Sequence, residues 1–317
     1  MFLRQFIFKH QNRIKIAGLQ QLFSHSVYKS HDEDEDTEGD LFNIQHCTAI
    51  INGGASGIGL AVAKQFLQKG VQRLSIMDID AEKGEDAQGC LSKTFGDDKV
   101  LFFEADVTNA KELDDAYRKS IQFHDIPDVV VNCAGIIDDT KWEKQLKTNM
   151  AGCVIGTLLG MQYMSKSSKG YGGIVTNISS IFGITPSSGY PLHTMTQFGI
   201  CGFTKAIGCG IHFTRTGVKI FALCPGLTDT LALTEAPKNA INDRFAQEFA
   251  DEIADSNPQK TESVARGLTD ILDEANPGSI WVVENDNAPY EIIYPGPLLN
   301  LKKDTQRNRD EYAFNTT

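Results

Sequence analysis

Short runs of apolar residues alternate with longer amphipathic stretches from residue 46 to residue 284. Several of these runs are apolar almost without a break, as expected of strands that are covered on both faces in a parallel sheet. The pattern predicts seven strands, at 47–52, 73–78, 100–105, 128–133, 173–178, 218–224 and 279–284. Between them it predicts helices at 58–69, 110–123, 142–165, 194–209 and 262–275.

This β-α alternation predicts a single doubly wound α/β domain. Its seven-stranded, mainly parallel sheet is expected to carry helices on both faces, joined by right-handed crossovers. The domain takes in residues 41–299, and no internal repeat is visible in it. The polar sequence at 300–317 indicates a disordered tail.

Charged residues set the N-terminal region apart from this domain. Residues 1–31 hold five basic residues and no acidic one, whereas residues 32–40 hold seven acidic residues and no basic one. The net charge of the whole chain is −11, which leaves −9 for residues 41–317. We interpret 32–40 as a disordered acidic linker because it has no apolar surface to bury. The basic extension is typical of a mitochondrial targeting segment, and a disordered tail is the alternative.

Composition excludes several classes of protein. No apolar run approaches the roughly 18 residues of a membrane-spanning helix, and a net acidic chain is a poor partner for nucleic acid. The seven cysteines form an odd set without a CxxC pair, which indicates a reduced intracellular protein. We therefore expect a cytoplasmic protein, or a mitochondrial one if the basic extension is a targeting segment. His46, His124 and His212 have no metal-ligand spacing to one another or to a cysteine, so no metal site is predicted.

Glycines gather between the first predicted strand and the first predicted helix, in the sequence Asn52-Gly-Gly-Ala-Ser-Gly-Ile-Gly59. Glycines allow a sharp turn and a close approach to a pyrophosphate, which the free N–H groups of the helix then stabilise. A glycine cluster alone is weak evidence, but its position after a strand is the context that this motif requires. The motif predicts a dinucleotide site at Gly53, Gly57, Ile58 and Gly59.

An acidic residue, Asp78, stands at the end of the second predicted strand, nineteen residues beyond Gly59. A carboxylate at this place accepts hydrogen bonds from both hydroxyls of an adenosine ribose and repels a 2′-phosphate. The glycine loop holds no Arg or Lys that would receive such a phosphate. These features favour NAD over NADP, and the alternative is that Asp78 caps the following helix.

Five more motifs follow along the chain. They are Asp106-Val107, Asn132-Cys133-Ala134-Gly135, Asn149 in LKTNMAG, Ser180 in IVTNISSIFG, and Pro225-Gly226-Leu227-Thr228-Asp229-Thr230. With the glycine pattern TGxxxGxG, in which Asn52 takes the Thr position, they resemble the short-chain dehydrogenase/reductase family. Within it they resemble the group of insect alcohol dehydrogenases and 15-hydroxyprostaglandin dehydrogenases. The resemblance covers about residues 41–295 and implies a Rossmann-type fold, an NAD cofactor and a homo-oligomer.

The resemblance also implies a role for each motif. Asp106 and Val107 correspond to the pair that holds the adenine ring, and Asn132, Ala134 and Gly135 to the NNAG segment. Asn149 corresponds to an asparagine that kinks a helix and orders a catalytic water, and Ser180 to the catalytic serine. The loop that contacts the nicotinamide carboxamide corresponds to Pro225, Gly226, Thr228 and Thr230.

The remaining catalytic pair departs from the family. The family places a Tyr thirteen residues after the Ser and a Lys four residues later, and here these positions hold His193 and Gln197. The flanking residues in PLHTMTQFGICGFTKAIG match the family pattern, so a shift of the alignment does not explain the change. Tyr190 lies three residues too early, and the next lysine, Lys205, lies too far along the helix.

The exchange changes the acid–base chemistry. In the family, the Lys ammonium lowers the pKa of the Tyr phenol, ordinarily about 10, so that the phenolate takes the alcohol proton. His193 needs no neighbouring cation, because the ordinary pKa of imidazole is about 6.5. Imidazole is shorter than phenol, however, and an error of about 1 Å can cost about 10²-fold in rate. Gln197 can hydrogen-bond a ribose but carries no charge.

Three hypotheses follow. The chain is an NAD-dependent oxidoreductase for a secondary alcohol or ketone, with weak or altered activity and His193 as substitute base. Alternatively, it is a catalytically inactive relative that binds NAD(H) and serves as a sensor or partner. In the third, it is a structural subunit that pairs with an active relative through its helices at 142–165 and 194–209.

Residues 231–260 lie where the family places its variable substrate lid. Cys133 and Cys224 are expected near the cofactor, as redox-sensitive thiols or as buried small residues.

Overall fold

Seven parallel strands and one short antiparallel strand form a single sheet in the part of the chain that the structure describes, residues 42–293. In this computed structural model the strands are β1 (Thr48–Asn52), β2 (Arg73–Asp78), β3 (Val100–Glu104), β4 (Val129–Asn132), β5 (Gly173–Ile178), β6 (Val218–Pro225), β7 (Ile280–Val283) and β8 (Tyr290–Glu291). The predictions for the extension 1–31, the linker 32–40 and the tail 300–317 lie outside the described residues.

The order of the strands creates a switch point in the middle of the sheet. It runs β3-β2-β1-β4-β5-β6-β7-β8, so the chain builds outward from β1 in one direction and then from β4 in the other. Connections that leave β1 and β4 for opposite sides open a crevice at their carboxyl ends. The predicted doubly wound α/β fold is confirmed.

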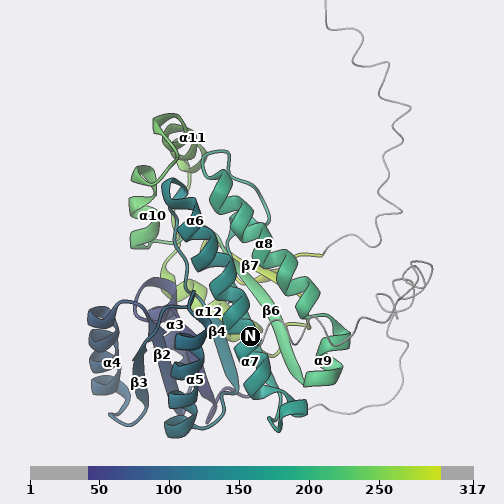
Figure 1. Cartoon of the computed structure of the whole chain (residues 1–317). Coiled ribbons are helices and arrows are strands. Elements are labelled where there is room, and N and C mark those ends of the chain that lie inside the picture. Colours follow the sequence, from purple (N-terminus) through teal and green to yellow (C-terminus); the bar gives the residue numbers. More distant parts are fainter. Residues whose placement is uncertain (1–41, 294–317) are drawn as a thin grey trace, which may run out of the picture. The chain divides into compact units, whose positions relative to one another are not determined.

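One face of the sheet is covered by α3 (Gly57–Gln68), α4 (Ala81–Phe95) and α12 (Thr261–Ile271), as Figure 1 allows the reader to follow. Alternate strand residues point to opposite faces, and Ala49 and Ile51 pack on this side together with residues from all three helices. Ile50, between them, packs on the other side.

The second face is covered by α5 (Ala110–His124), α7 (Cys153–Met164) and α8 (Pro191–Ile207). A short helix, α6 (Trp142–Gln145), and a π-helical segment, Leu146–Gly152, lead directly into α7. The sequence pattern predicted one helix over 142–165. In the structure, this range is divided into α6, the π-helical segment and α7, which follow one another without a break. Helix α8 begins at Pro191, a residue that suits the first helical position because it has no N–H to leave unpaired.

Three further α-helices in the described residues are α9 (Gly210–Thr216), α10 (Leu231–Glu235) and α11 (Asp243–Ile253). Helices α10 and α11 belong to the stretch 231–260. Phe249 of α11 is almost fully buried against Tyr190, with the two ring centroids 4.8 Å apart. Within residues 42–293, no helix combines the length and the apolar character needed to cross a membrane.

The sequence pattern did not predict strand β8 or the helices α4 and α9. The sheet has eight strands rather than seven, because the two-residue β8 pairs antiparallel with β7 and is too short to produce an alternating pattern. Helix α4 was also missed. Its face toward the sheet carries Gly84 and only two buried apolar residues, Ala87 and Leu91. A Cβ on Gly84 would lie 2.1 Å from the ring of Phe102, so the close packing of α4 on β3 requires a glycine at this position. The same glycine interrupts the apolar pattern by which the helix would have been predicted.

Candidate active site

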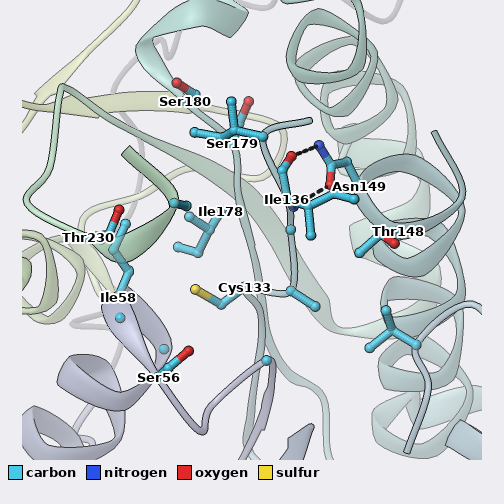
Figure 2. A pocket seen from close by; sticks show the side chains of 18 of the residues that line it. Ser56, Ile58, Cys133, Ile136, Thr148, Asn149, Ile178, Ser179, Ser180 and Thr230 are labelled. Atoms are coloured by element: carbon cyan, nitrogen blue, oxygen red, sulfur yellow. Dashed lines mark hydrogen bonds between the residues drawn. The ribbon is translucent and has the colours of Figure 1, made fainter. Parts of the chain in front are cut away.

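A cavity of about 550 Å³ opens at the carboxyl ends of β1, β4, β5 and β6. Figure 2 shows part of its wall, with residues contributed by segments far apart in the sequence. Of the eighteen predicted site residues, seventeen line this cavity and Asn132 does not. Motifs separated by up to 177 positions, from Gly53 to Thr230, therefore meet at one place.

The glycine loop is packed too closely for side chains. Gly53 has φ +80°, and a Cβ there would lie 2.5 Å from the backbone of Ala134. A Cβ on Gly59 would lie 1.9 Å from the carbonyl oxygen of Gly53. These two glycines hold the loop against the start of the Ala134–Gly135 segment and bring the first turn of α3 to the cavity.

The N-terminus of α3 is open toward the cavity. Its cap residue, Ser56, makes no side-chain hydrogen bond to the helix, and the first turn holds no acidic residue. Ser56, Gly57, Ile58 and Gly59 all line the cavity. Unpaired N–H groups and the positive end of the helix dipole make this a suitable place for a phosphate or pyrophosphate.

Asp78 ties the glycine loop to the end of β2. Its carboxylate accepts hydrogen bonds from the backbone N–H of Ala55 (3.1 Å) and of Asp80 (3.1 Å). The residue that caps α4 is Asp80, not Asp78, which excludes the alternative role for Asp78. Lys83, which the sequence reasoning missed, also lines the cavity, and its ammonium pairs with Asp80 at 2.7 Å. This end of the cavity thus carries two carboxylates and one ammonium.

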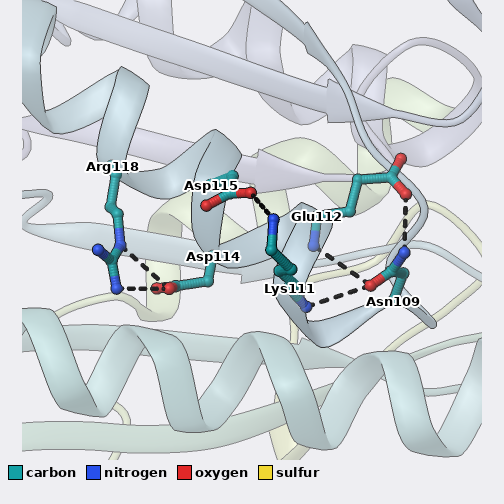
Figure 3. Close-up of polar contacts among 6 residues, drawn as sticks. All are labelled: Asn109, Lys111, Glu112, Asp114, Asp115 and Arg118. Carbon is teal, nitrogen blue, oxygen red and sulfur yellow. Dashed lines mark hydrogen bonds and ion pairs between the residues drawn. The ribbon is translucent and has the colours of Figure 1, made fainter.

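Helix α5 fixes the position of Asp106. Asn109 caps the helix by accepting hydrogen bonds from the N–H groups of Lys111 and Glu112. Glu112 reaches back to accept hydrogen bonds from the N–H of Asp106 (2.8 Å) and from the side-chain amide of Asn109 (3.1 Å), which ties Asp106 to the start of the helix. Figure 3 shows the contacts among Asn109, Lys111 and Glu112.

Ion pairs run along the exposed side of the same helix, from Lys111 to Asp115 and from Arg118 to Asp114. With its side chains held in this way, α5 places Asp106 and Val107 on the cavity wall.

Asn132 lies away from the cavity, in a chain of buried amides. Asn52, Asn132 and Asn177 are register partners on β1, β4 and β5, and all three are at most 5% exposed. The Asn52 amide donates to Asn132 (2.8 Å), and the Asn132 amide donates to Asn177 (2.8 Å). Asn177 in turn donates to Thr204 of α8 (2.9 Å). The structure therefore gives Asn132 a role in joining the strands, because the last residue of β4 points toward α7 rather than toward the crevice.

Asn149 lies in the middle of the π-helical segment and fixes the loop after β4. Its side chain accepts from the N–H of Ile136 (2.8 Å) and donates to the carbonyl of the same residue (2.9 Å), as Figure 2 shows. Its amide also lies 3.2 Å from the hydroxyl of Thr196 on α8. Asn149 thus links the β4 loop to the helix that carries His193 and Gln197.

His193 is buried, with 5% of its surface exposed, and its Nδ1 has no hydrogen-bond partner within the described residues. Burial lowers the pKa of this imidazole to about 4, an effect that a contact with the backbone of Ile136 opposes in part. The ring is therefore neutral at physiological pH and can accept a proton.

Gln197, one turn further along α8, is occupied by its neighbours. Its Oε1 accepts from the hydroxyl of Ser179 (3.2 Å), and its Nε2 donates to the hydroxyl of Thr196 (3.3 Å). Ser179 lines the cavity and was not singled out from the sequence, because its neighbour Ser180 carries the motif position. Ser180 also lines the cavity, and its Oγ accepts from the N–H of Phe182 (3.2 Å).

The two residues that the sequence analysis rejected as a substitute catalytic pair lie outside the cavity wall. Tyr190 is fully buried, donates its hydroxyl proton to the carbonyl of Ala236, and packs on Phe249. Lys205 lies further along α8 and does not line the cavity. Tyr190 therefore anchors the segment that carries α10 and α11.

The loop after β6 and the start of α10 close another side of the cavity. Pro225, Gly226, Thr228 and Thr230 line it, followed by an apolar group, Leu231, Ala232 and Leu233. The stretch 231–260 thus contributes to the wall where a substrate lid was expected.

Two sulfur-containing side chains were expected near the cofactor. Cys133 lines the cavity, whereas Cys224 is buried behind it, 3.6 Å from the sulfur of Cys201. The described residues hold no group of three or more His, Cys, Asp or Glu that fits a metal ion.

The sequence of this chain is similar to those of several known proteins. A family model described as short chain dehydrogenase matches residues 47–241. Human 15-hydroxyprostaglandin dehydrogenase, whose name specifies NAD(+), is 34% identical over 207 residues, which are 65% of this chain and 77% of that protein. Alcohol dehydrogenase 2 of Ceratitis rosa is 28% identical and covers 74% of this chain and 89% of that protein.

Two solved structures have a similar fold. Levodione reductase superposes with a TM-score of 0.65 at 22% identity, over 76% of this chain and 96% of that chain. ElxO with NADP bound superposes with a TM-score of 0.62 at 26% identity, over 75% of this chain and 97% of that chain.

The burial of His193 predicts a dependence of stability on pH. Because the pKa is about 4 in the folded state and about 6.5 in the unfolded state, only the unfolded chain binds this proton as the pH falls between these values. The free energy of unfolding should fall by about 2 kcal/mol between pH 8 and pH 5 on account of His193. Urea unfolding of the wild type and His193→Gln should show this difference. His212→Gln, on α9 outside the cavity, should retain the wild-type dependence, and equal slopes for all three proteins would contradict a neutral buried His193.

Proposed function

The chain belongs to the short-chain dehydrogenase family, and from its site we propose that it is an NAD(H)-dependent oxidoreductase for secondary alcohols or ketones. The observation that carries the proposal is the meeting of the open N-terminus of α3, Asp78, Ser180 and His193 on the wall of one cavity.

The residues present fit NAD. The N–H groups at the start of α3 suit the pyrophosphate, Asp78 suits the hydroxyls of the adenosine ribose, and Asp106 with Val107 forms the adenine end. When bound, the nicotinamide supplies the hydride acceptor for alcohol oxidation and the hydride donor for ketone reduction. The carboxylates of Asp78 and Asp80 favour NAD over NADP, although Lys83 lies beside them.

His193 and Ser180 are the groups that would handle the substrate oxygen. The Ser180 hydroxyl donates a hydrogen bond to that oxygen, and the neutral His193 ring accepts the proton that the alcohol loses. A base of pKa about 4 is weak at physiological pH, and proton transfer is most efficient when the pKa of the base lies near the working pH. We therefore expect weak activity, slower than the family pair would support.

The substrate is expected to be apolar around its alcohol or ketone group. Ile136, Ile137, Phe182, Leu231 and Leu233 line the cavity together with Ser180 and His193. Side chains of this kind bind hydrocarbon and leave recognition of the oxygen to the few polar groups.

A second function is favoured by Gln197. Because both ends of its amide are used by Ser179 and Thr196, it offers less to a nicotinamide ribose than its position suggests. A protein that binds NAD(H) without efficient turnover, as a sensor or partner subunit, is the alternative.

We propose a homo-oligomer that uses α7 and α8. Met195 and Phe198 are 45% and 43% exposed on α8, and Gly202 continues their row with open space around it. Leu158 of α7 is also 43% exposed. An apolar row at helical spacing on the surface indicates contact with another apolar surface.

We also propose a cytoplasmic location, because all seven cysteines are unpaired, as in a reducing compartment. The mitochondrial alternative depends on residues 1–31, outside the described residues.

The oligomer is tested by size. Met195→Glu with Phe198→Glu should convert the assembly to monomers in analytical ultracentrifugation, because four or more buried charges oppose pairing. Tyr171→Glu, which changes an aromatic residue that is 86% exposed outside these helices, should leave the size unchanged. A monomeric wild type would reject the interface.

Cofactor choice is tested by calorimetry with NADH and NADPH. The wild type should bind NADH at least about tenfold more tightly, and Asp78→Ala should remove most of the difference, since a hydrogen bond to a charged group contributes about 1.5–3 kcal/mol. Asp86→Ala, at an exposed position on α4 outside the cavity wall, is the matched control and should bind both cofactors as the wild type does. Failure of the wild type to bind either cofactor would overturn both candidate functions.

Turnover is tested by restoring the family pair. His193→Tyr with Gln197→Lys should raise NAD-dependent oxidation of apolar secondary alcohols by about 10²-fold or more, because general base catalysis contributes about 10²–10⁴-fold. His193→Tyr alone should gain less, because no ammonium then lowers the phenol pKa. Measurable oxidation by the wild type supports the enzyme, whereas NADH binding without turnover in the wild type supports the sensor. No gain in the double variant would contradict a pocket shaped for an alcohol.

A further inference from the structure

Asp139 is a buried carboxylate that no part of the proposed reaction uses. It is 2% exposed and lies in a short turn, Asp139–Lys141, between β4 and α6. Its side chain accepts three hydrogen bonds: from the N–H of Leu192 (2.9 Å), from the N–H of His193 (2.8 Å) and from the side-chain amide of Gln145 (2.8 Å). All three donors are uncharged, so the carboxylate is held by dipoles.

Two of these donors are the first free N–H groups of α8. The residue before the helix, Tyr190, provides no side-chain cap, and Pro191 has no N–H. Asp139 therefore caps α8 from a segment 53 positions earlier in the chain, and its negative charge faces the positive end of a 17-residue helix. One of the two capped groups belongs to His193 itself.

The turn that carries Asp139 is itself held on three sides. Its own N–H donates to the carbonyl of Asn239 (2.9 Å), before α11. Gln145 binds the Asp139 carboxylate with its amide nitrogen and accepts from the N–H of Asp138 (2.7 Å) with its oxygen. Asn149 fixes Ile136, three residues upstream, by two hydrogen bonds. A displacement of the first turn of α8 would have to break this network.

We propose that Asp139 is a positioning residue for His193, which sets the place of the imidazole in the cavity by holding the backbone of the first turn of α8. The proposal rests on the proposed function only in giving His193 the role of base. The position of the ring is a property of the folded chain and is measurable without turnover.

Three parts of the site should respond differently to loss of the Asp139 carboxylate. Loss of the Asp139 carboxylate moves His193, whose own N–H it binds, more than Gln197, which is held one turn later by Ser179. The hydrogen bonds of the Asp139 side chain within residues 42–293 go to Gln145, Leu192 and His193, and none goes to the cofactor-binding end around Asp78. The expected signature is therefore a loss of turnover without a loss of cofactor affinity.

The test compares Asp139→Asn with Asp138→Asn. The Oδ1 of Asp139 accepts from His193 and Gln145, and its Oδ2 accepts from Leu192. An Asn at 139 keeps one accepting oxygen but removes the negative charge and turns an NH₂ group against the N–H of Leu192, so the first turn of α8 loses part of its cap. Asp138 lies in the same segment at 8% exposure, but its carboxylate binds Thr140 and Lys141 and does not bind α8. Both variants should lose stability, so each is first shown to be folded at the assay temperature.

In Asp139→Asn, the NMR signals of the His193 ring, identified by their absence in His193→Gln, should shift or broaden. The affinity for NADH should stay within about twofold, and any alcohol oxidation should fall about 10²-fold in kcat, as expected of a displacement near 1 Å. Asp138→Asn should leave the ring signals and kcat at wild-type values. Unchanged His193 signals in Asp139→Asn, or equal changes in the two variants, would overturn the proposal.

A measurement on the wild type covers the case in which Asp139→Asn does not fold. The N–H groups of Leu192 and His193 should exchange with solvent more slowly than that of Glu262, which occupies the second position of α12, a helix whose cap provides no side chain. Exchange as fast as at Glu262 would contradict the cap. A wild type without turnover would reject the enzyme function, while the ring signals and amide exchange would still decide the role of Asp139.

Discussion

The arrangement of the site depends on a ladder of buried amides that crosses the middle of the sheet. Asn52, Asn132 and Asn177 stand opposite one another on β1, β4 and β5, and Thr204 extends the ladder to α8. A shift of one strand by a single residue would turn these polar groups into apolar packing and leave their partners unpaired, at a cost of about 1–3 kcal/mol each. The ladder therefore fixes the register of the three strands whose carboxyl ends form the cavity. It also secures α8 at a point three turns beyond His193.

Helix α8 is held at both of its ends by buried polar contacts with other segments. Asp139 binds its first turn, and Asn177 binds Thr204 near its last turn. Between these points Thr196 joins the helix to Asn149, and Ser179 joins it to β5 through Gln197. The side chain at 197 thus takes part in the attachment of the helix. This explains why an uncharged amide is accommodated at this position: its oxygen and nitrogen both find partners inside the protein, which an ammonium, a donor only, would not reproduce.

Much of the fold was predictable because it is recorded in local patterns. Strands covered on both faces are continuous apolar runs, and the glycine loop follows the first of them, so the doubly wound sheet and its crevice follow from the sequence. Side-chain direction is not recorded locally. Asn132 lies beside the cavity-lining segment and points the other way. Ser179 and Asp139 matter through their contacts with α8, a helix that lies 18 and 53 positions further along the chain. Helix α4 was hidden by the glycine that its packing requires.

The same burial that makes His193 available as a base limits its use as one. Oxidation of an alcohol leaves a proton on the base, and an imidazole of pKa about 4 holds that proton at pH 7 at a cost of about 4 kcal/mol, which corresponds to about 10³-fold. In the family pair the balance is the reverse: a phenol holds the proton readily, and the cation lowers the cost of giving it up to form the phenolate. Here the group that favours the charged imidazole is the backbone of Ile136. The carbonyl of Ile136 also accepts a hydrogen bond from Asn149, so it is shared between two donors when the imidazole is charged. Under the proposed function, this site would bind and orient a nicotinamide and an alcohol better than it moves the proton between them, so affinity and turnover would be separable.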